Sequence, residues 1–115
     1  SISGYGLTGT FITGANKSDN NKRAGSNIVD YIYEDMLVCS PSKKGSKGFT
    51  SLEFCIASGD SGGGLFIDGK LAGINSCIMS SNGPPNSSYN EESGHTRVSK
   101  FIDWIKLSKE ILKKD

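Results

Sequence analysis

The stretch SGDSGGGLF, residues 58–66, places Ser61 in the pattern Gly-Asp-Ser-Gly-Gly. This is the setting of a reactive serine that could attack a carbonyl carbon. A hydroxyl with an ordinary pKa does so only when an imidazole takes its proton and a carboxylate orients that imidazole. The chain contains one histidine, His95. The chemistry open to Ser61 therefore depends on whether His95 is that base or whether the base comes from elsewhere.

The clearest strand signal follows Ser61 directly, in GGLFIDGKLAGINSCI, where two apolar runs flank Asp68-Gly69. That dipeptide suits a two-residue type I′ turn, so we expect a β-hairpin there. Two further segments, Tyr5–Thr13 and Asn27–Val38, predict strands or strand pairs. The polar segments between them are predicted to be loops, at 14–25, 40–51 and 80–94.

The C-terminal segment, about residues 99–113, has apolar side chains near helical spacing and lysines near its end. Ser99 is in a position to cap this helix. We expect an amphipathic helix that packs on the β body and buries Trp104 or Ile105.

Composition favours one turn-rich β domain covering residues 1–115, because fifteen glycines are dispersed among short apolar runs. A net charge of +1 points to no nucleic acid and no membrane partner. No apolar run approaches the ~18 residues of a membrane span. The N-terminus SISGYGLTGT lacks the regions of a signal peptide, so we expect any targeting segment to lie upstream or to have been removed.

Five motifs stand in order along the chain: Gly4-Tyr5-Gly6, GDSGG followed by Leu65-Phe66, LAGI at 71–74, TRVS at 96–99 and Trp104-Ile105. From about Ser3 to Ile105 the chain resembles the second half of the trypsin/chymotrypsin-like serine endopeptidases. The resemblance implies an all-β fold, a six-stranded antiparallel Greek-key barrel with a C-terminal α-helix, which is one half of a double barrel. It also implies a secreted or extracellular protein, periplasmic in a bacterium, made as a zymogen and needing no cofactor or metal.

The same resemblance assigns roles near the serine. Ser61 would be the nucleophile, and the N–H groups of Gly59 and Ser61 would bind the oxyanion. Asp60 would pair with an amino terminus freed by zymogen cleavage. The catalytic histidine and aspartate belong to the family's first barrel, which this chain lacks. We therefore expect the chain alone to be inactive and to need that barrel as a partner.

The resemblance also locates a specificity pocket for the substrate side chain. Trypsin-type enzymes hold an aspartate six residues before the nucleophile, and Cys55 stands there in this chain. This favours a neutral pocket for a small or apolar side chain, with Glu53 either leaning in or, more simply, serving the structure. The opposite wall, whose backbone would pair with an extended peptide, would be Ser76, Cys77 and Ile78.

His95 has two main interpretations, and the role of catalytic base is the least favoured. It would either line the pocket and favour acidic side chains, as in some glutamate-specific relatives, or be a hydrogen-bonded structural residue.

Three cysteines, Cys39, Cys55 and Cys77, cannot all pair within the chain. The family usually bridges the two pocket walls, with one cysteine at the position of Ala57 here, so Cys55–Cys77 is a displaced candidate. Cys39 would then be free, buried or bonded to another chain, such as a first barrel.

Two hypotheses follow for the function. The first is the nucleophile-bearing half of a serine endopeptidase that hydrolyses peptide bonds of a peptide or protein substrate. The alternative is a non-catalytic binding or inhibitory module in which Ser61 is a relic. The intact GDSGG loop favours the first, and the missing histidine and aspartate keep the second open.

Overall fold

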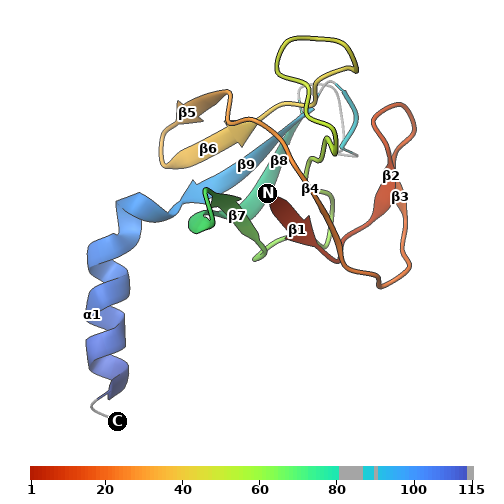
Figure 1. Cartoon of the computed structure of the whole chain (residues 1–115). Helices are drawn as coiled ribbons and strands as arrows, with labels where there is room; N and C mark the ends of the chain where they lie inside the picture. Colours follow the sequence, from red (N-terminus) through yellow and green to blue (C-terminus); the bar gives the residue numbers. More distant parts are fainter. Residues whose placement is uncertain (81–86, 90, 114–115) are drawn as a thin grey trace.

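The computed structural model describes residues 1–80, 87–89 and 91–113 and is mostly β, with one C-terminal helix (Figure 1). In these residues there are nine strands, a 3₁₀ turn and an α-helix. Their bounds are β1 Ile2–Gly4, β2 Thr8–Thr10, β3 Gly14–Lys17, β4 Arg23–Gly25, β5 Tyr31–Tyr33, β6 Met36–Cys39, β7 Gly64–Ile67, β8 Lys70–Ser80, β9 Glu91–Arg97, η1 Val98–Phe101 and α1 Ile102–Lys113.

Seven strands form one antiparallel sheet in the order β4-β1-β7-β8-β9-β6-β5, and β2 pairs with β3 in a separate hairpin. Closing a barrel requires the first and last strands to pair. Here the edge strands β4 and β5 are three residues each and do not pair with one another. The sheet is therefore open, and the closed six-stranded barrel expected from the sequence is not confirmed.

The hairpin predicted after Ser61 is confirmed as β7 and β8. Asp68 and Gly69 form its two-residue turn, with φ of 51° and 75°. Two successive positive φ angles are the signature of the type I′ turn that this dipeptide favours. The turn fixes the start of β8, the longest strand in the described residues, beside the serine loop.

Of the other predictions for the strands and loops, some were confirmed and others were wrong. Asn27–Val38 contains the β5–β6 hairpin, as expected, but Tyr5–Thr13 holds only the three residues of β2. The predicted loop at 14–25 was wrong, because it contains β3 and β4. These short polar strands form because β2 and β1 lie beside them, and partner strands decide such pairings more than intrinsic propensity does.

The hydrophobic core is small and lies under the serine loop. Its buried members are Ile2 of β1, Leu37 of β6, Leu65 of β7 and Ile56, which lies five residues before Ser61. Partly buried apolar side chains pack around them, from Val29, Phe54, Ala72 and Ile78. The core thus anchors the backbone on both sides of the serine.

The C-terminal helix forms where expected but does not pack as expected. It projects from the sheet (Figure 1), none of its residues is buried, and Trp104 is 66% exposed. Ser99 lies inside η1, whose N-terminus has no side-chain cap. The radius of gyration, 15.1 Å, exceeds the ~13 Å typical of a compact 115-residue domain. The predicted burial of Trp104 or Ile105 was wrong, because Ile105 is only half-buried and the described chain leaves most of Trp104 uncovered.

Candidate active site

Ser61 is exposed on a tight turn that ends where β7 begins. Gly59 and Gly62 flank it with φ of 98° and 87°, a backbone region that residues with a Cβ rarely adopt. Within the described part of the chain, neither the Gly59 nor the Ser61 amide donates a hydrogen bond. The serine hydroxyl and two amide donors are therefore all available to a ligand.

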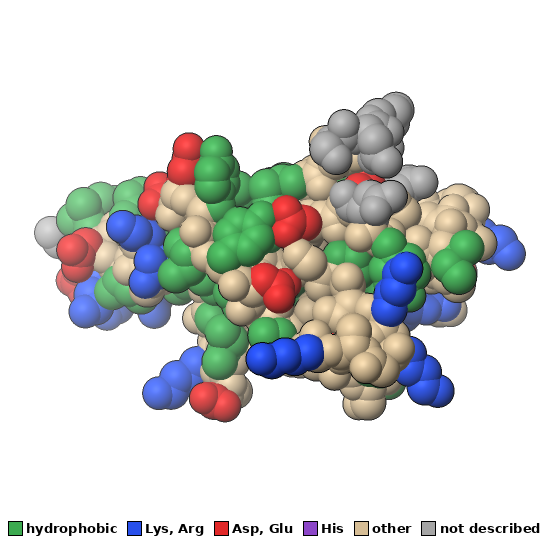
Figure 2. Space-filling view, turned by 90° about the horizontal axis from the view of Figure 1, so that it is seen from above, with side chains coloured by type: hydrophobic (Ala, Val, Ile, Leu, Met, Phe, Trp, Pro, Cys, Tyr) green, Lys and Arg blue, Asp and Glu red, His purple; other side chains and the backbone are tan. Residues whose placement is uncertain are grey.

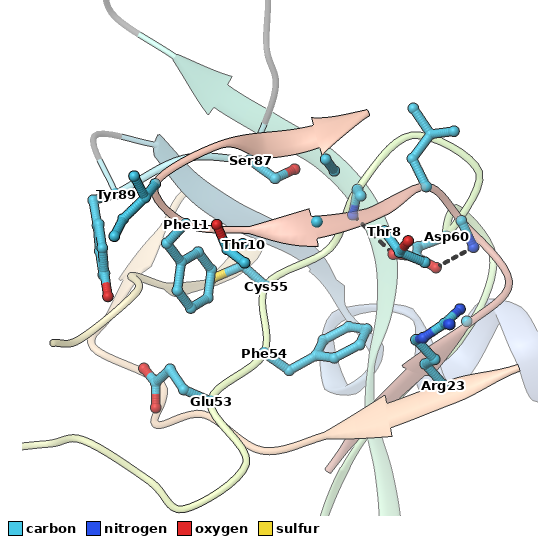
Figure 3. Close-up of a pocket in the computed structure, with 17 residues that line it drawn as sticks. Thr8, Thr10, Phe11, Arg23, Glu53, Phe54, Cys55, Asp60, Ser87 and Tyr89 are labelled. Atoms are coloured by element: carbon cyan, nitrogen blue, oxygen red, sulfur yellow. Dashed lines mark hydrogen bonds between the residues drawn. The ribbon is translucent and has the colours of Figure 1, made fainter. Parts of the chain in front are cut away.

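The aspartate beside the serine faces the opposite way. Asp60 is 4% exposed, and its carboxylate accepts the N–H of Gly6 at 2.7 Å and the N–H of Ala57 at 2.8 Å (Figure 3). A Cβ added at Gly4 would overlap this carboxylate, so only glycine fits there. This close contact explains why the Gly4-Tyr5-Gly6 motif begins with a glycine.

Asn75 of β8 holds the serine loop from beneath, and sequence reasoning missed it. Its Nδ2 donates to the Asp60 carbonyl oxygen at 3.0 Å and to the Ser3 carbonyl oxygen at 3.1 Å. Its backbone N–H donates to Gly63 O, and its carbonyl accepts from Gly62 N. The available signal was an asparagine directly after the apolar run LAGI of a predicted strand, since a buried side chain there needs partners.

His95 of β9 lies in the interior, fully buried, with Nδ1 2.9 Å from Asn75 Oδ1. Burial lowers the pKa of its imidazole to about 4, so the ring is neutral at pH 7. Its other nitrogen, Nε2, is buried and has no hydrogen-bond partner in the described structure. His95 therefore makes no hydrogen bond with the Ser61 hydroxyl, and it does not reach the surface.

A cavity of about 400 Å³ opens on the other side of the Asp60 carboxylate (Figure 3). Phe11 and Tyr89, whose ring centroids are 5.1 Å apart, lie at the end away from Asp60. Cys55 also lines this cavity, whereas the predicted opposite wall, Ser76, Cys77 and Ile78, does not. The structure therefore does not bring the predicted pocket residues together around this space.

Among the described residues, neither Cys55 nor Glu53 offers a free negative charge to the predicted pocket. Burial raises the pKa of the Cys55 thiol to about 11, so it is uncharged at pH 7, and its sulfur accepts the Asn27 side-chain N–H at 3.4 Å. The Glu53 carboxylate accepts the backbone N–H groups of Ser42 and Thr50, both at 2.9 Å. Through these hydrogen bonds Glu53 stabilises the polar loop at residues 40–51.

The predicted substrate-pairing wall lies along the second half of β8. Ser76 is the extra residue of a β-bulge, since Asn75 pairs with His95 and Cys77 pairs with Gly94. Past Ile74, β8 pairs with β9 on one side, and no described strand pairs with its other side. That side is an open edge to which an extended peptide could add.

None of the three cysteines forms a disulfide. The Cys77 sulfur contacts Met36 Sδ at 3.6 Å, whereas Cys55 faces Asn27, so the predicted Cys55–Cys77 bridge is not formed. Cys39 is buried in β6, and burial raises its thiol pKa to about 12.

The site is therefore an exposed serine on a glycine-rich turn of an antiparallel β scaffold, with a buried aspartate next to it and two amides that have no partner in the described structure. The family model described as Trypsin matches residues 1–105, and the chain belongs to the trypsin family. No curated protein and no solved structure matched the chain. No helix of the described residues is long and apolar enough to cross a membrane.

Proposed function

We propose that this chain is the nucleophile-bearing half of a serine endopeptidase and acts only together with a first barrel that supplies the histidine and aspartate. The observation that carries the proposal is the exposed Ser61 hydroxyl beside the unoccupied amides of Gly59 and Ser61. His95 is unsuited to the role of base, because it is buried and bonded to Asn75. The base must therefore come from outside this chain.

In the proposed reaction, the partner's imidazole takes the Ser61 proton while Oγ bonds to the carbonyl carbon of the substrate. The resulting oxyanion accepts the N–H groups of Gly59 and Ser61. The C–N bond then breaks, and the imidazolium gives its proton to the leaving amine. Water, deprotonated by the same imidazole, hydrolyses the acyl-enzyme and releases Ser61.

The apolar surface around α1 supports the proposal that a partner domain packs against this chain. A groove of about 370 Å³ is lined by Ile74, Thr96, Val98, Phe101, Trp104 and Ile105. Figure 2 shows hydrophobic side chains exposed among charged ones on one face of the molecule. The accessible surface, 7526 Å², exceeds the ~6,100 Å² typical of a folded protein of 12.2 kDa. We propose that the first barrel covers the groove and the apolar side of α1.

For the substrate, we propose an extended peptide that adds to the open edge of β8 at Ser76, Cys77 and Ile78. Because Cys55 is uncharged and the Glu53 carboxylate is occupied, we expect small or apolar side chains before the scissile bond. A pocket without a counter-charge disfavours arginine and lysine, since a desolvated unpaired charge costs several kcal/mol.

We also propose that Asp60 links activity to zymogen cleavage. Its carboxylate lines the 400 Å³ cavity, so a freed amino terminus entering that space would meet a buried negative charge. Such processing, and the family's usual setting, are consistent with a secreted or extracellular protein, or a periplasmic one in a bacterium.

The test supplies a first barrel of a trypsin-family protease, either as a separate chain or fused ahead of Ser1. A fluorophosphonate should label Ser61, peptide hydrolysis should appear, and Ser61→Ala should abolish both. Ser58→Ala, an exposed serine of the same loop, is the matched control and should retain them. Labelling of another residue, or no labelling of Ser61 although the first barrel has docked, would contradict the proposal and favour a non-catalytic binding module.

A further inference from the structure

The amide of Asn75 and the imidazole of His95 form a buried polar pair that has no place in the family-derived assignments. The side-chain orientation of Asn75 is settled by its partners, because the carbonyls of Ser3 and Asp60 can only accept hydrogen bonds. Both therefore face Nδ2, and Oδ1 faces His95. An amide oxygen can only accept, so Nδ1 of His95 must carry the proton and Nε2 must be bare.

The unprotonated Nε2 is buried and has no hydrogen-bond partner among the described residues, an arrangement that destabilises the fold. The single hydrogen bond of the ring is the one to Asn75 Oδ1 in the described structure. A buried orphan atom in a native fold calls for an explanation. The hydrogen bonds of the described structure thus give the His95 ring one role, which is to orient the Asn75 amide.

The Asn75 amide acts on the peptide that links Asp60 to Ser61. That peptide's carbonyl accepts Nδ2 at 3.0 Å, and its N–H is the Ser61 amide. In a trans peptide these two groups point in opposite directions, so fixing the carbonyl fixes the N–H. An accepted hydrogen bond also polarises the peptide and strengthens its N–H as a donor.

We propose that Asn75, oriented by His95, is a positioning residue that holds the Ser61 N–H in the direction needed to bind the oxyanion. The chain of contacts runs from His95 Nδ1–H to Asn75 Oδ1, from Asn75 Nδ2–H to the Asp60 carbonyl, and through that peptide to Ser61 N–H. The catalytic part of this inference rests on the proposed function, whereas the orientation of the peptide does not.

The first experiment uses the chain itself and needs no activity. Because His95 is the only histidine, nitrogen-15 NMR of its ring should show Nδ1 protonated and Nε2 bare at pH 7. A ring protonated at Nε2 instead would overturn the inference, since Asn75 would then be unoriented.

The second experiment replaces Asn75 by aspartate, which keeps the shape and the acceptor for His95 but cannot donate to the Asp60 carbonyl. Hydrogen exchange of the Gly62 and Gly63 amides should accelerate by about tenfold relative to global unfolding, the effect of one lost hydrogen bond. His95→Leu provides a second variant at the other end of the pair. Val38→Ala, a core substitution in β6, controls for general destabilisation and should leave the relative exchange unchanged.

The third experiment measures kinetics after a first barrel has been supplied. Asn75→Asp should lower kcat by about tenfold or more with KM nearly unchanged, because the oxyanion contact is made in the transition state. Val38→Ala should keep both constants. If Asn75→Asp and the unsubstituted chain have equal kcat, the positioning role of Asn75 is refuted, whereas the proposed function is not. If the unsubstituted chain never becomes active, the proposed function fails, and the exchange experiment still decides the role of Asn75.

Discussion

Acid should destabilise this protein through His95, and the size of the effect follows from its burial. The ring titrates near pH 4 in the folded chain and near pH 6.5 when unfolded. Between these values the unfolded chain binds a proton that the folded chain excludes. Stability is therefore full above pH 6.5 and falls as the pH decreases toward 4. At ~1.4 kcal/mol per pKa unit, the loss is about 2 kcal/mol at pH 5 and about 3 kcal/mol below pH 4.

The assay is urea unfolding followed by circular dichroism at pH 7 and pH 5, for the unsubstituted chain and for His95→Leu. The leucine variant should be less stable at pH 7, because Asn75 Oδ1 loses its donor, but its stability should depend less on pH by about 2 kcal/mol. Asp19 does not interfere at these two pH values, because its carboxyl is ionised in both the folded and the unfolded chain; the hydrogen bond with Arg23 lowers its folded pKa and affects stability only nearer pH 4. Equal pH dependence in the two proteins would refute the reasoning.

Three further predictions test the serine loop, the apolar surface and the pocket. Gly4→Ala should destabilise the chain by about 3 kcal/mol in urea unfolding, because the methyl group overlaps the Asp60 carboxylate. In the control Gly45→Ala the methyl meets nothing within 4 Å and only the φ of 87° opposes it, so the loss should be about 1 kcal/mol; equal losses would contradict the overlap. The chain alone should self-associate in sedimentation velocity, and Trp104→Lys with Leu107→Lys should reduce it; a monodisperse unsubstituted monomer would argue against an uncovered interface. With a first barrel supplied, peptides varied at one position should be cleaved best after small or apolar residues, and dominant cleavage after arginine or lysine would overturn the neutral pocket.

Local signals predicted the elements that depend on few residues. The type I′ turn at Asp68-Gly69 was predictable because two positive φ angles restrict the choice of residues severely. Strands β3 and β4 were not predictable, since polar residues such as those of Gly14–Lys17 pair only because β2 lies beside them. The open sheet was likewise hidden, because closure depends on two edge strands far apart in the sequence.

In the candidate site, too, the sequence predicted the local backbone but not the contacts between distant segments. The position of Ser61 on a glycine-flanked turn was predicted from GDSGG, because the motif itself sets the backbone. The partners of Asp60 were not predicted, since Gly6 lies 54 residues away in the sequence. The role of Asn75 depends on three segments that meet only in the fold, at Ser3, Asp60 and His95.

Two separate features of the described chain support the proposed first barrel. The serine loop has an exposed hydroxyl and two amides without a partner in the described structure, whereas the only histidine of the chain is buried. The C-terminal helix has an apolar side that no described residue covers. The lack of a base would lower the rate of the proposed reaction. The uncovered helix lowers the stability of the fold, and this is a separate effect. A domain that carries the histidine and aspartate and packs against α1 would remove both, whereas a partner of a non-catalytic module would account only for the uncovered helix.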